Sequence, residues 1–103
     1  MQIQFRNGYL EKICAGLPVS GKPRYTQDVL EKFRKRILIL KSAESTAELQ
    51  QFRSLHVEAL KGDKKGLFSI RIDLKYRLGF SIEKNRITLT EIRLVEDRSN
   101  HYR

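Results

Sequence analysis

The first half of the chain carries hydrophobic patterns typical of one strand and two helices. Apolar and polar residues alternate over 1–5, which predicts a short strand, and Asn7 is a favourable N-cap for the helix after it. A loop over 17–24 holds both prolines, a second helix is expected from about Thr26, and a capping-box spacing over 45–48 predicts one more short helix. The two helical stripes are Tyr9, Leu10, Ile13, Cys14 and Leu17, and then Leu30, Phe33, Ile37 and Leu40.

From about His56 the hydrophobic period changes from helical spacing to strict alternation. Residues 62–66 have the composition of a turn, and an antiparallel meander of three or four strands is expected after it. Ile92 and Leu94 have the opposite parity to Ile87 and Leu89, so we expect a β-bulge near 90–91 that restores the phase. Together the patterns predict an α+β fold, with the N-terminal strand and two helices packed on one face of a mainly antiparallel sheet.

The alternation also predicts the register of this sheet and its core. Burial between helices and sheet should stabilise the fold by roughly 1.5–3 kcal/mol for each large side chain. Even-numbered residues of 68–72 should therefore face the helices, and a register that slipped by one residue would point them to solvent. The expected core residues are Phe5, Leu10, Ile13, Leu30, Phe33, Ile37, Phe68, Ile70, Leu78, Phe80 and Ile92.

The same register brings three arginines together on the polar face of the sheet. Pairing Ile70 with Leu78 across a three-residue loop keeps the apolar positions on one face, and it puts Arg71 opposite Arg77. After the bulge, the matching register of the next hairpin puts Arg77 opposite Arg93 as well. We refer to these three residues as the arginine row.

Composition limits the classes of protein to which the chain can belong. Its 103 residues predict a single domain over 1–103, and its net charge of +9 favours a polyanionic partner such as nucleic acid. Its longest apolar run, 37–40, is too short to span a membrane, and the N-terminus lacks the pattern of a secretion signal. One cysteine and two histidines exclude a disulfide framework and a Cys-rich or multi-histidine metal site. We expect a cytoplasmic domain without a cofactor.

Two explanations of the arginine row remain open. Like charges directly opposite each other destabilise a sheet, so the first is that Asp73, Glu58 or Glu91 neutralises the row, or that the guanidinium groups spread into solvent. The second is that the row binds an anion, because the planar guanidinium fork suits phosphate. Three further cations are expected at the mouth of the same sheet, namely Lys61, Lys64 and Lys65.

Other candidate residues have both a functional and a structural interpretation. His101 and Tyr102, near the C-terminus, could move protons or stack on a base, or could simply pack at the edge of the core. His56 is expected to be structural or exposed, and Cys14 to belong to the core. The basic face of the second helix, usually a solvated face in such helices, consists of Lys32, Arg34, Lys35, Arg36 and Lys41.

The β half of the chain resembles a known toxin superfamily. A Leu-Lys-Gly-Asp turn at 60–63, a Ser-Ile-Arg-Ile strand at 69–72 and a Tyr-Arg pair at 76–77 recur at this spacing in the RelE/ParE superfamily. The resemblance is strongest over 57–80 and is greatest to HigB-type toxins, also known as plasmid maintenance killer proteins. It implies a RelE-like fold and the toxin of a type II toxin–antitoxin pair.

The resemblance further implies an activity and roles for individual residues. HigB-type toxins enter the ribosomal A site and cut mRNA without a metal, using the RNA 2′-hydroxyl as the nucleophile. Arg71 and Arg77 would stabilise charge on the scissile phosphate, and His101 or Tyr102 would transfer protons. The order of these last two differs from the usual pattern, so the acid and the base are not assigned. The candidates for binding RNA phosphates are Lys61, Lys64, Lys65 and Arg93.

The resemblance also implies partners and leaves alternative functions. Many members carry a histidine three residues before the motif lysine, a position that Glu58 occupies in this chain, while His56 lies two residues further back. The expected partners are the ribosome, mRNA and a HigA-like helix-turn-helix antitoxin, through which alone promoter DNA would be bound. No membrane partner is expected. The alternatives are a ParE-like inhibitor of DNA gyrase without nuclease activity, and a degenerate toxin that only binds its antitoxin.

Overall fold

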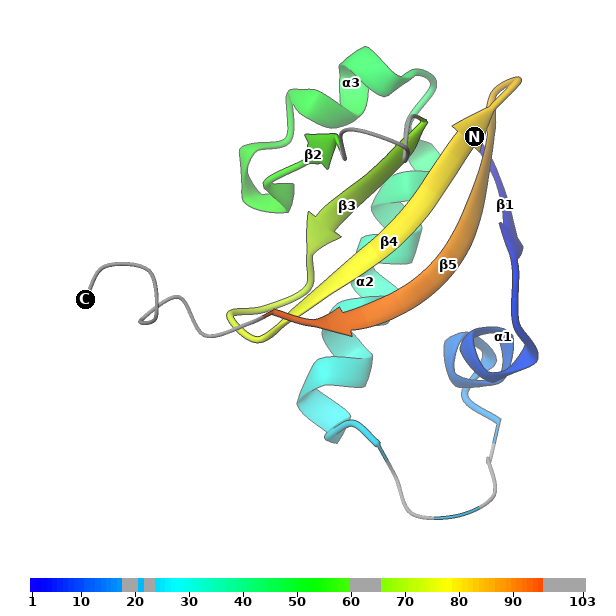
Figure 1. Ribbon diagram of the computed structural model, residues 1–103, viewed down its shortest axis with the longest axis vertical. Helices are drawn as coiled ribbons and strands as arrows, with labels where there is room; N and C mark the ends of the chain where they lie inside the picture. Colours follow the sequence, from blue (N-terminus) through cyan, green and yellow to red (C-terminus); the bar gives the residue numbers. More distant parts are fainter. Residues whose placement is uncertain (18–20, 22–23, 60–65, 96–103) are drawn as a thin grey trace.

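A mainly antiparallel sheet is the centre of the fold (Figure 1). The computed structural model describes residues 1–17, 21, 24–59 and 66–95. Within these residues five strands lie in the order β1-β5-β4-β3-β2. Strand β1 runs parallel to β5, and the other neighbours are antiparallel. The strands are β1 (Gln2–Phe5), β2 (Glu58–Ala59), β3 (Leu67–Arg71), β4 (Tyr76–Glu83) and β5 (Arg86–Leu94).

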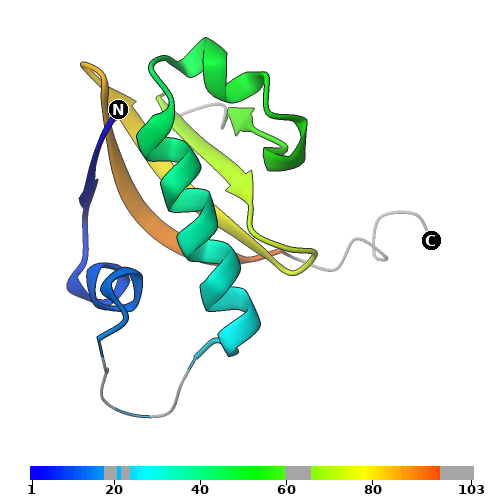
Figure 2. The ribbon, with the colours of Figure 1, turned by 180° about the vertical axis from the view of Figure 1, so that it is seen from behind.

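The long helix crosses one face of this sheet, as Figure 2 shows from behind. The helices are α1 (Gly8–Ala15), α2 (Gln27–Ser42) and α3 (Thr46–Gln50), with a 3₁₀ turn η1 (Arg53–Leu55). Each α-helix begins at a side-chain cap: the side-chain oxygens of Asn7, Thr26 and Ser45 accept hydrogen bonds from backbone N–H groups three residues later. Asn7 and Ser45 are the predicted caps, and Thr26 is the predicted start of the second helix. The predicted fold class, with helices on one face of the sheet, is confirmed.

Most of the predicted core is buried between α2 and the sheet. Leu10, Ile13, Phe33, Ile37, Ile70, Leu78 and Phe80 are buried, whereas Phe5, Leu30, Phe68 and Ile92 pack against the core but are only partly buried. The prediction of burial was therefore wrong in its extent for these last four. Phe5 ends the edge strand β1, for example, and has a neighbouring strand on one side only. Leu49 and Leu55, which the periodicity does not mark, are fully buried.

The register of β3, β4 and β5 is the predicted one. Ile70 pairs with Leu78, and Leu78 pairs with Ile92. Gly79 faces Glu91 but the next residue of β4 faces Leu89, so Thr90 is the extra residue of a bulge at the predicted place. A Cβ atom at Gly79 would lie 3.1 Å from Thr90 Oγ1, which explains why glycine suits the position opposite the bulge.

Candidate functional site

The arginine row exists as the register predicts. Arg71 on β3 faces Arg77 on β4, and Arg77 faces Arg93 on β5. Because Ile70 and Leu78 are fully buried in the core, alternation puts the three arginines on the sheet face away from α2. Arg71 and Arg77 are partly buried and Arg93 is exposed. The polar face of the sheet therefore presents cationic side chains from three adjacent strands.

Arg77 is held by the strand beside it and by the segment that precedes β2. Its Nε donates to Ser69 Oγ at 2.9 Å, and its Nη2 donates to the Ser69 carbonyl at 3.1 Å. Nη2 also donates to the main-chain carbonyl of His56. Only 12% of the Arg77 side chain is exposed. The guanidinium therefore has a fixed position on the polar face, and this largely buried side chain makes charge-assisted hydrogen bonds there.

One of the three acidic candidates lies beside the row. Glu58 Oε1 is 3.8 Å from Arg77 Nη2, and the Glu58 side chain is 65% exposed. Asp73 has another role, since its Oδ1 accepts from the backbone N–H groups of Lys75 and Tyr76 at 2.8 and 2.9 Å and shapes the β3–β4 turn. Glu91 is exposed opposite Gly79. Of the three acidic candidates, Glu58 therefore pairs with Arg77, the central arginine of the row.

His56 meets the expectation of a structural, exposed histidine, but it also contributes to the site. Its side chain is exposed and its backbone has a φ of 48°, in the left-handed region. This backbone conformation ends η1 and accompanies the carbonyl contact with Arg77. No side-chain pattern indicated the contact, because the group involved is a main-chain oxygen.

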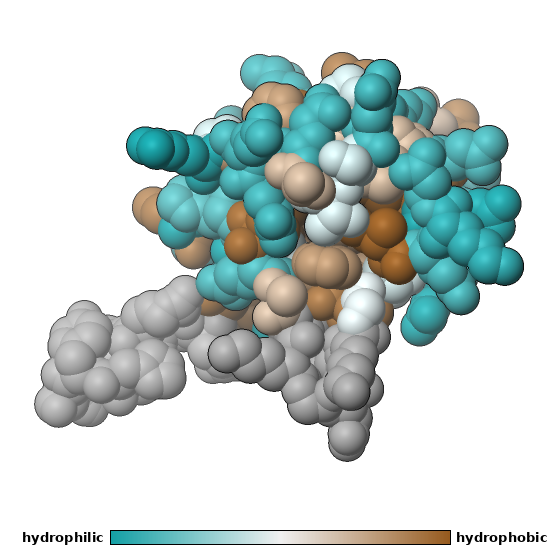
Figure 3. All heavy atoms as spheres, turned by 90° about the horizontal axis from the view of Figure 1, so that it is seen from above, coloured by the Kyte–Doolittle hydropathy of each residue, from teal (hydrophilic) through white to brown (hydrophobic). Residues whose placement is uncertain are grey.

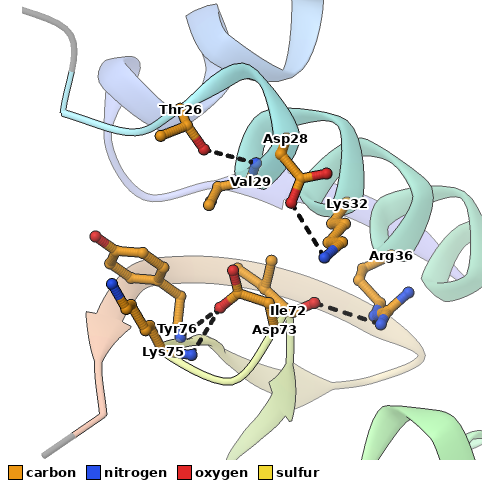
Figure 4. A network of polar contacts seen from close by, with 9 residues as sticks. All are labelled: Thr26, Asp28, Val29, Lys32, Arg36, Ile72, Asp73, Lys75 and Tyr76. Carbon is orange, nitrogen blue, oxygen red and sulfur yellow. Dashed lines mark hydrogen bonds and ion pairs between the residues drawn. The ribbon is translucent and has the colours of Figure 1, made fainter.

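The basic face of α2 is not merely solvated. Arg36 Nε donates to the Arg71 carbonyl at 2.8 Å, and Arg36 Nη2 donates to the Ile72 carbonyl at 3.4 Å. Arg34 Nε donates to the Ile13 carbonyl at 3.1 Å, and Lys32 pairs with Asp28 at 3.1 Å. Figure 4 shows the start of α2 facing the β3–β4 turn, with Arg36 reaching the end of β3. Arg36 therefore secures the main chain that carries Arg71.

A cluster of tyrosines lies near the start of α2. The rings of Tyr25 and Tyr76 meet edge to face at 5.3 Å, Tyr9 is 6.3 Å from Tyr25, and Arg24 lies 4.5 Å over the Tyr9 ring. Burial raises the pKa of the Tyr25 hydroxyl above its ordinary value, with Tyr9 and Tyr76 adding to the effect. Cys14 packs against the core but is only partly buried, and this burial raises the pKa of its thiol. These groups support packing between α1, α2 and β4.

Several predicted site residues lie outside the part of the chain that the structure describes, namely Lys61, Lys64, Lys65, His101 and Tyr102. Among the described residues, no three His, Cys, Asp or Glu side chains form a group that could hold a metal ion.

Figure 3 shows the molecule from above, relative to the orientation of Figure 1. On this face, hydrophilic side chains cover much of the described surface, and apolar side chains form smaller patches between them.

Comparison with known protein families identifies the family of this chain. The family of HigB-like toxins, described as the RelE-like toxin of the type II toxin–antitoxin system HigB, matches residues 4–92. The chain belongs to this family. It is therefore a RelE-like toxin of a type II toxin–antitoxin system, as the resemblance implied. Comparison with curated protein sequences gave no match.

Solved toxin structures share the fold of this HigB-like toxin. The YoeB–YefM complex from Staphylococcus aureus is similar over 92% of this chain and 97% of that chain, with a TM-score of 0.59 and 20% identity. A YafQ variant from E. coli is similar over 99% of this chain and 98% of its own, with a TM-score of 0.59 and 10% identity. The archaeal RelE–RelB complex from Pyrococcus horikoshii is similar over 90% of this chain and 92% of that chain, with a TM-score of 0.55 and 16% identity. No described helix of the toxin is long and apolar enough to cross a membrane.

Proposed function

We propose that this HigB-like toxin is a ribosome-dependent endoribonuclease that cuts mRNA and so inhibits translation. The observation that carries the proposal is the arginine row, in which three cations from adjacent strands share one sheet face and a carboxylate lies 3.8 Å from the central one. Membership of a RelE-like toxin family supports it. An RNA strand supplies the anions that such a row can bind, and the net charge of +9 favours association with ribosomal RNA as well.

In the proposed reaction the 2′-hydroxyl oxygen attacks the adjacent phosphorus atom. The bond from phosphorus to the 5′ oxygen breaks, which leaves a 2′,3′-cyclic phosphate and a 5′-hydroxyl end. Negative charge grows on the non-bridging oxygens in the transition state, and Arg77 and Arg71 would stabilise it by hydrogen bonding. Arg93 would bind a neighbouring phosphate, together with the three lysines Lys61, Lys64 and Lys65. No metal takes part in this scheme.

Two proton transfers accompany the proposed cleavage. One group must accept the 2′-hydroxyl proton, and another must donate a proton to the leaving 5′ oxygen. His101 and Tyr102 remain the proposed pair from the tail, in either order. Glu58 is an additional candidate for the acceptor, because its exposed carboxylate lies beside Arg77 and can reach a substrate bound on the row.

The proposed partners follow from the same activity. A toxin of this kind needs an antitoxin, and two of the similar structures are complexes, of YoeB with YefM and of RelE with RelB. We propose a HigA-like helix-turn-helix antitoxin, whose DNA-binding part would bring the pair to promoter DNA. The toxin would act in the cytoplasm, where translating ribosomes are found, without a membrane partner.

A cleavage assay with and without ribosomes tests the proposal. The toxin, made by cell-free synthesis, is added to a defined mRNA alone and to the same mRNA on translating ribosomes. Cuts that depend on ribosomes and leave cyclic phosphate ends are the expected result. Inhibition of gyrase supercoiling without any cleavage would contradict it and favour the ParE-like alternative. Antitoxin binding without either activity would identify a degenerate toxin.

A further inference from the structure

The buried hydroxyl of Ser69 is placed to orient the central arginine of the row. Ser69 is 3% exposed and lies on β3, and its ladder partners are Glu58 on β2 and Gly79 on β4. Arg77 lies two residues before Gly79 on β4, so its side chain runs diagonally across the two strands to reach Ser69. Ser69 therefore lies between the two charged groups of the site, Glu58 and Arg77.

The hydrogen bonds made by Ser69 fix the guanidinium plane. Its Oγ accepts from Arg77 Nε at 2.9 Å, and its carbonyl accepts from Arg77 Nη2 at 3.1 Å. Two contacts to different nitrogens of one planar group define its orientation as well as its position. The main-chain contact would survive any side-chain substitution, but the Nε contact requires a hydroxyl at position 69. Without it, the guanidinium would lose the Nε contact, one of the two contacts with Ser69 that define its plane.

We propose that Ser69 is a positioning residue, whose hydroxyl sets the orientation in which Arg77 meets the scissile phosphate. The inference rests on the proposed cleavage for its catalytic consequence, but the orientation of Arg77 is a property of the free toxin. Preorganised donors contribute to catalysis only when they point at the position where charge develops, so a rotated guanidinium would bind RNA and still fail to stabilise the transition state.

A matched pair of substitutions isolates the hydroxyl. Ser69→Thr and Ser69→Val add nearly the same volume to a strand position and differ in the hydroxyl alone. Ser81→Val, at a partly buried serine of β4 on the same face of the sheet, controls for an added β-branched apolar side chain. Thermal unfolding of all variants establishes the folded fraction, and rates are expressed per folded molecule.

Two measurements on these proteins test the proposal. The first is the exchange rate of the Arg77 Nε–H proton with water, followed by nitrogen-edited NMR in the free toxin. We expect protection in the wild type, Ser69→Thr and Ser81→Val, and at least about tenfold faster exchange in Ser69→Val. The second is single-turnover mRNA cleavage on ribosomes, where Ser69→Val should lower the maximal rate by about tenfold to a hundredfold with little change in the half-saturating ribosome concentration.

Each outcome supports or overturns the positioning role. Equal Arg77 protection in Ser69→Thr and Ser69→Val overturns it, and so does equal cleavage by the two variants when the wild type is active. Loss of protection and of cleavage in Ser69→Val, with both retained in Ser69→Thr, supports it. If the wild type does not cleave mRNA at all, the proposed function fails, while the exchange measurement still decides whether Ser69 holds Arg77.

Discussion

Arg71 and Arg77 face each other directly on β3 and β4, yet the structure secures them in different ways. The Arg77 guanidinium bonds to Ser69 and to the His56 carbonyl, with Glu58 nearby. For Arg71 it is the main chain that is secured, by Arg36 from α2. Like charges opposite each other cost roughly a few tenths to 1 kcal/mol. The hydrogen bonds of Arg77 offset that cost, so the row can persist in the absence of RNA.

Arg77→Ala should impair both cleavage and folding. Loss of a preorganised cation should lower single-turnover cleavage on the order of 10²–10³-fold. Loss of its hydrogen bonds to the Ser69 and His56 groups should also lower the free energy of unfolding by about 1–3 kcal/mol. Cleavage per folded molecule and urea unfolding, measured on the same sample, separate the two effects.

Arg93→Ala is the matched control for this substitution, because Arg93 lies in the same row but is exposed. It should leave the free energy of unfolding within about 0.5 kcal/mol of the wild type and weaken ribosome binding at low salt more than at high salt. Intact cleavage in Arg77→Ala, counted per folded molecule, would refute the proposed active site.

Glu58→Gln should separate proton transfer from ion pairing. The Glu58 side chain is 65% exposed and lies 3.8 Å from Arg77, so solvent screens its charge and the unfolding free energy should change by less than about 0.5 kcal/mol. If Glu58 accepts the 2′-hydroxyl proton, the amide should lower single-turnover cleavage by about 10²-fold or more. A Glu58→Gln variant that cleaves at the wild-type rate would leave the acceptor role to the C-terminal tail.

Removal of residues 101–103 should reduce cleavage far more than ribosome binding. The deletion takes away the proposed proton-transfer pair His101 and Tyr102, and each such group typically contributes about 10²–10⁴-fold. Many other cations share the binding of the ribosome, so its affinity should change by only a few fold. Equilibrium binding to ribosomes and single-turnover cleavage give the two values. Equal loss in both would show that the tail serves in binding.

The parts of the fold that follow a period could be predicted from the sequence. A slip of one residue would turn Ile70 and Leu78 to solvent, so burial together with the three-residue loop fixes the β3–β4 register and with it the arginine row. The change of parity before Ile92 in the same way reveals the bulge. These inferences depend on which face of each strand is apolar and on the length of one short turn, both of which can be read from the sequence.

The parts that depend on irregular backbone could not be predicted in this way. The His56 carbonyl contacts Arg77 because the chain turns through a left-handed residue between η1 and β2. Leu49 and Leu55 are buried but lie on α3 and η1, which are too short to show a repeating hydrophobic pattern. The contact of Arg36 with the end of β3 depends on how α2 crosses the sheet, which the helical period leaves open. Tertiary placement, and not local sequence, decides these contacts.

Alkaline pH should destabilise the toxin partly through Tyr25. Burial raises the pKa of its hydroxyl in the folded state above the ordinary value of 10.0, which the unfolded chain should keep. The stabilisation is complete below pH 10.0 and is lost as pH rises through the folded-state pKa. Tyr25→Phe should therefore change the dependence of the unfolding free energy on pH between about pH 8 and pH 11. Urea unfolding of the wild type and of Tyr25→Phe at each end of this pH range measures the difference. The same pH dependence in both proteins would contradict the assignment to Tyr25.

The bulge at Thr90 should produce a coupling between positions 79 and 90 in the free energy of unfolding. A Cβ atom at position 79 would lie 3.1 Å from Thr90 Oγ1, closer than ordinary contact, while the added methyl would also reduce the entropy of the unfolded chain. Gly79→Ala alone should therefore be neutral or destabilising. Once Thr90→Ala has removed the crowding oxygen, the same change should stabilise the protein by roughly 0.4–1 kcal/mol.

A double-mutant cycle on Gly79 and Thr90 measures this coupling directly. We expect the two substitutions together to be more stable than the sum of the single effects predicts, by at least about 0.5 kcal/mol, because the residues are in contact. Ser81→Ala in place of Thr90→Ala is the control, since Ser81 lies on β4 beyond the bulge and faces Thr88. It should combine additively with Gly79→Ala. Additivity in both cycles would mean that Thr90 does not crowd position 79, and the bulge would then need another explanation for its glycine.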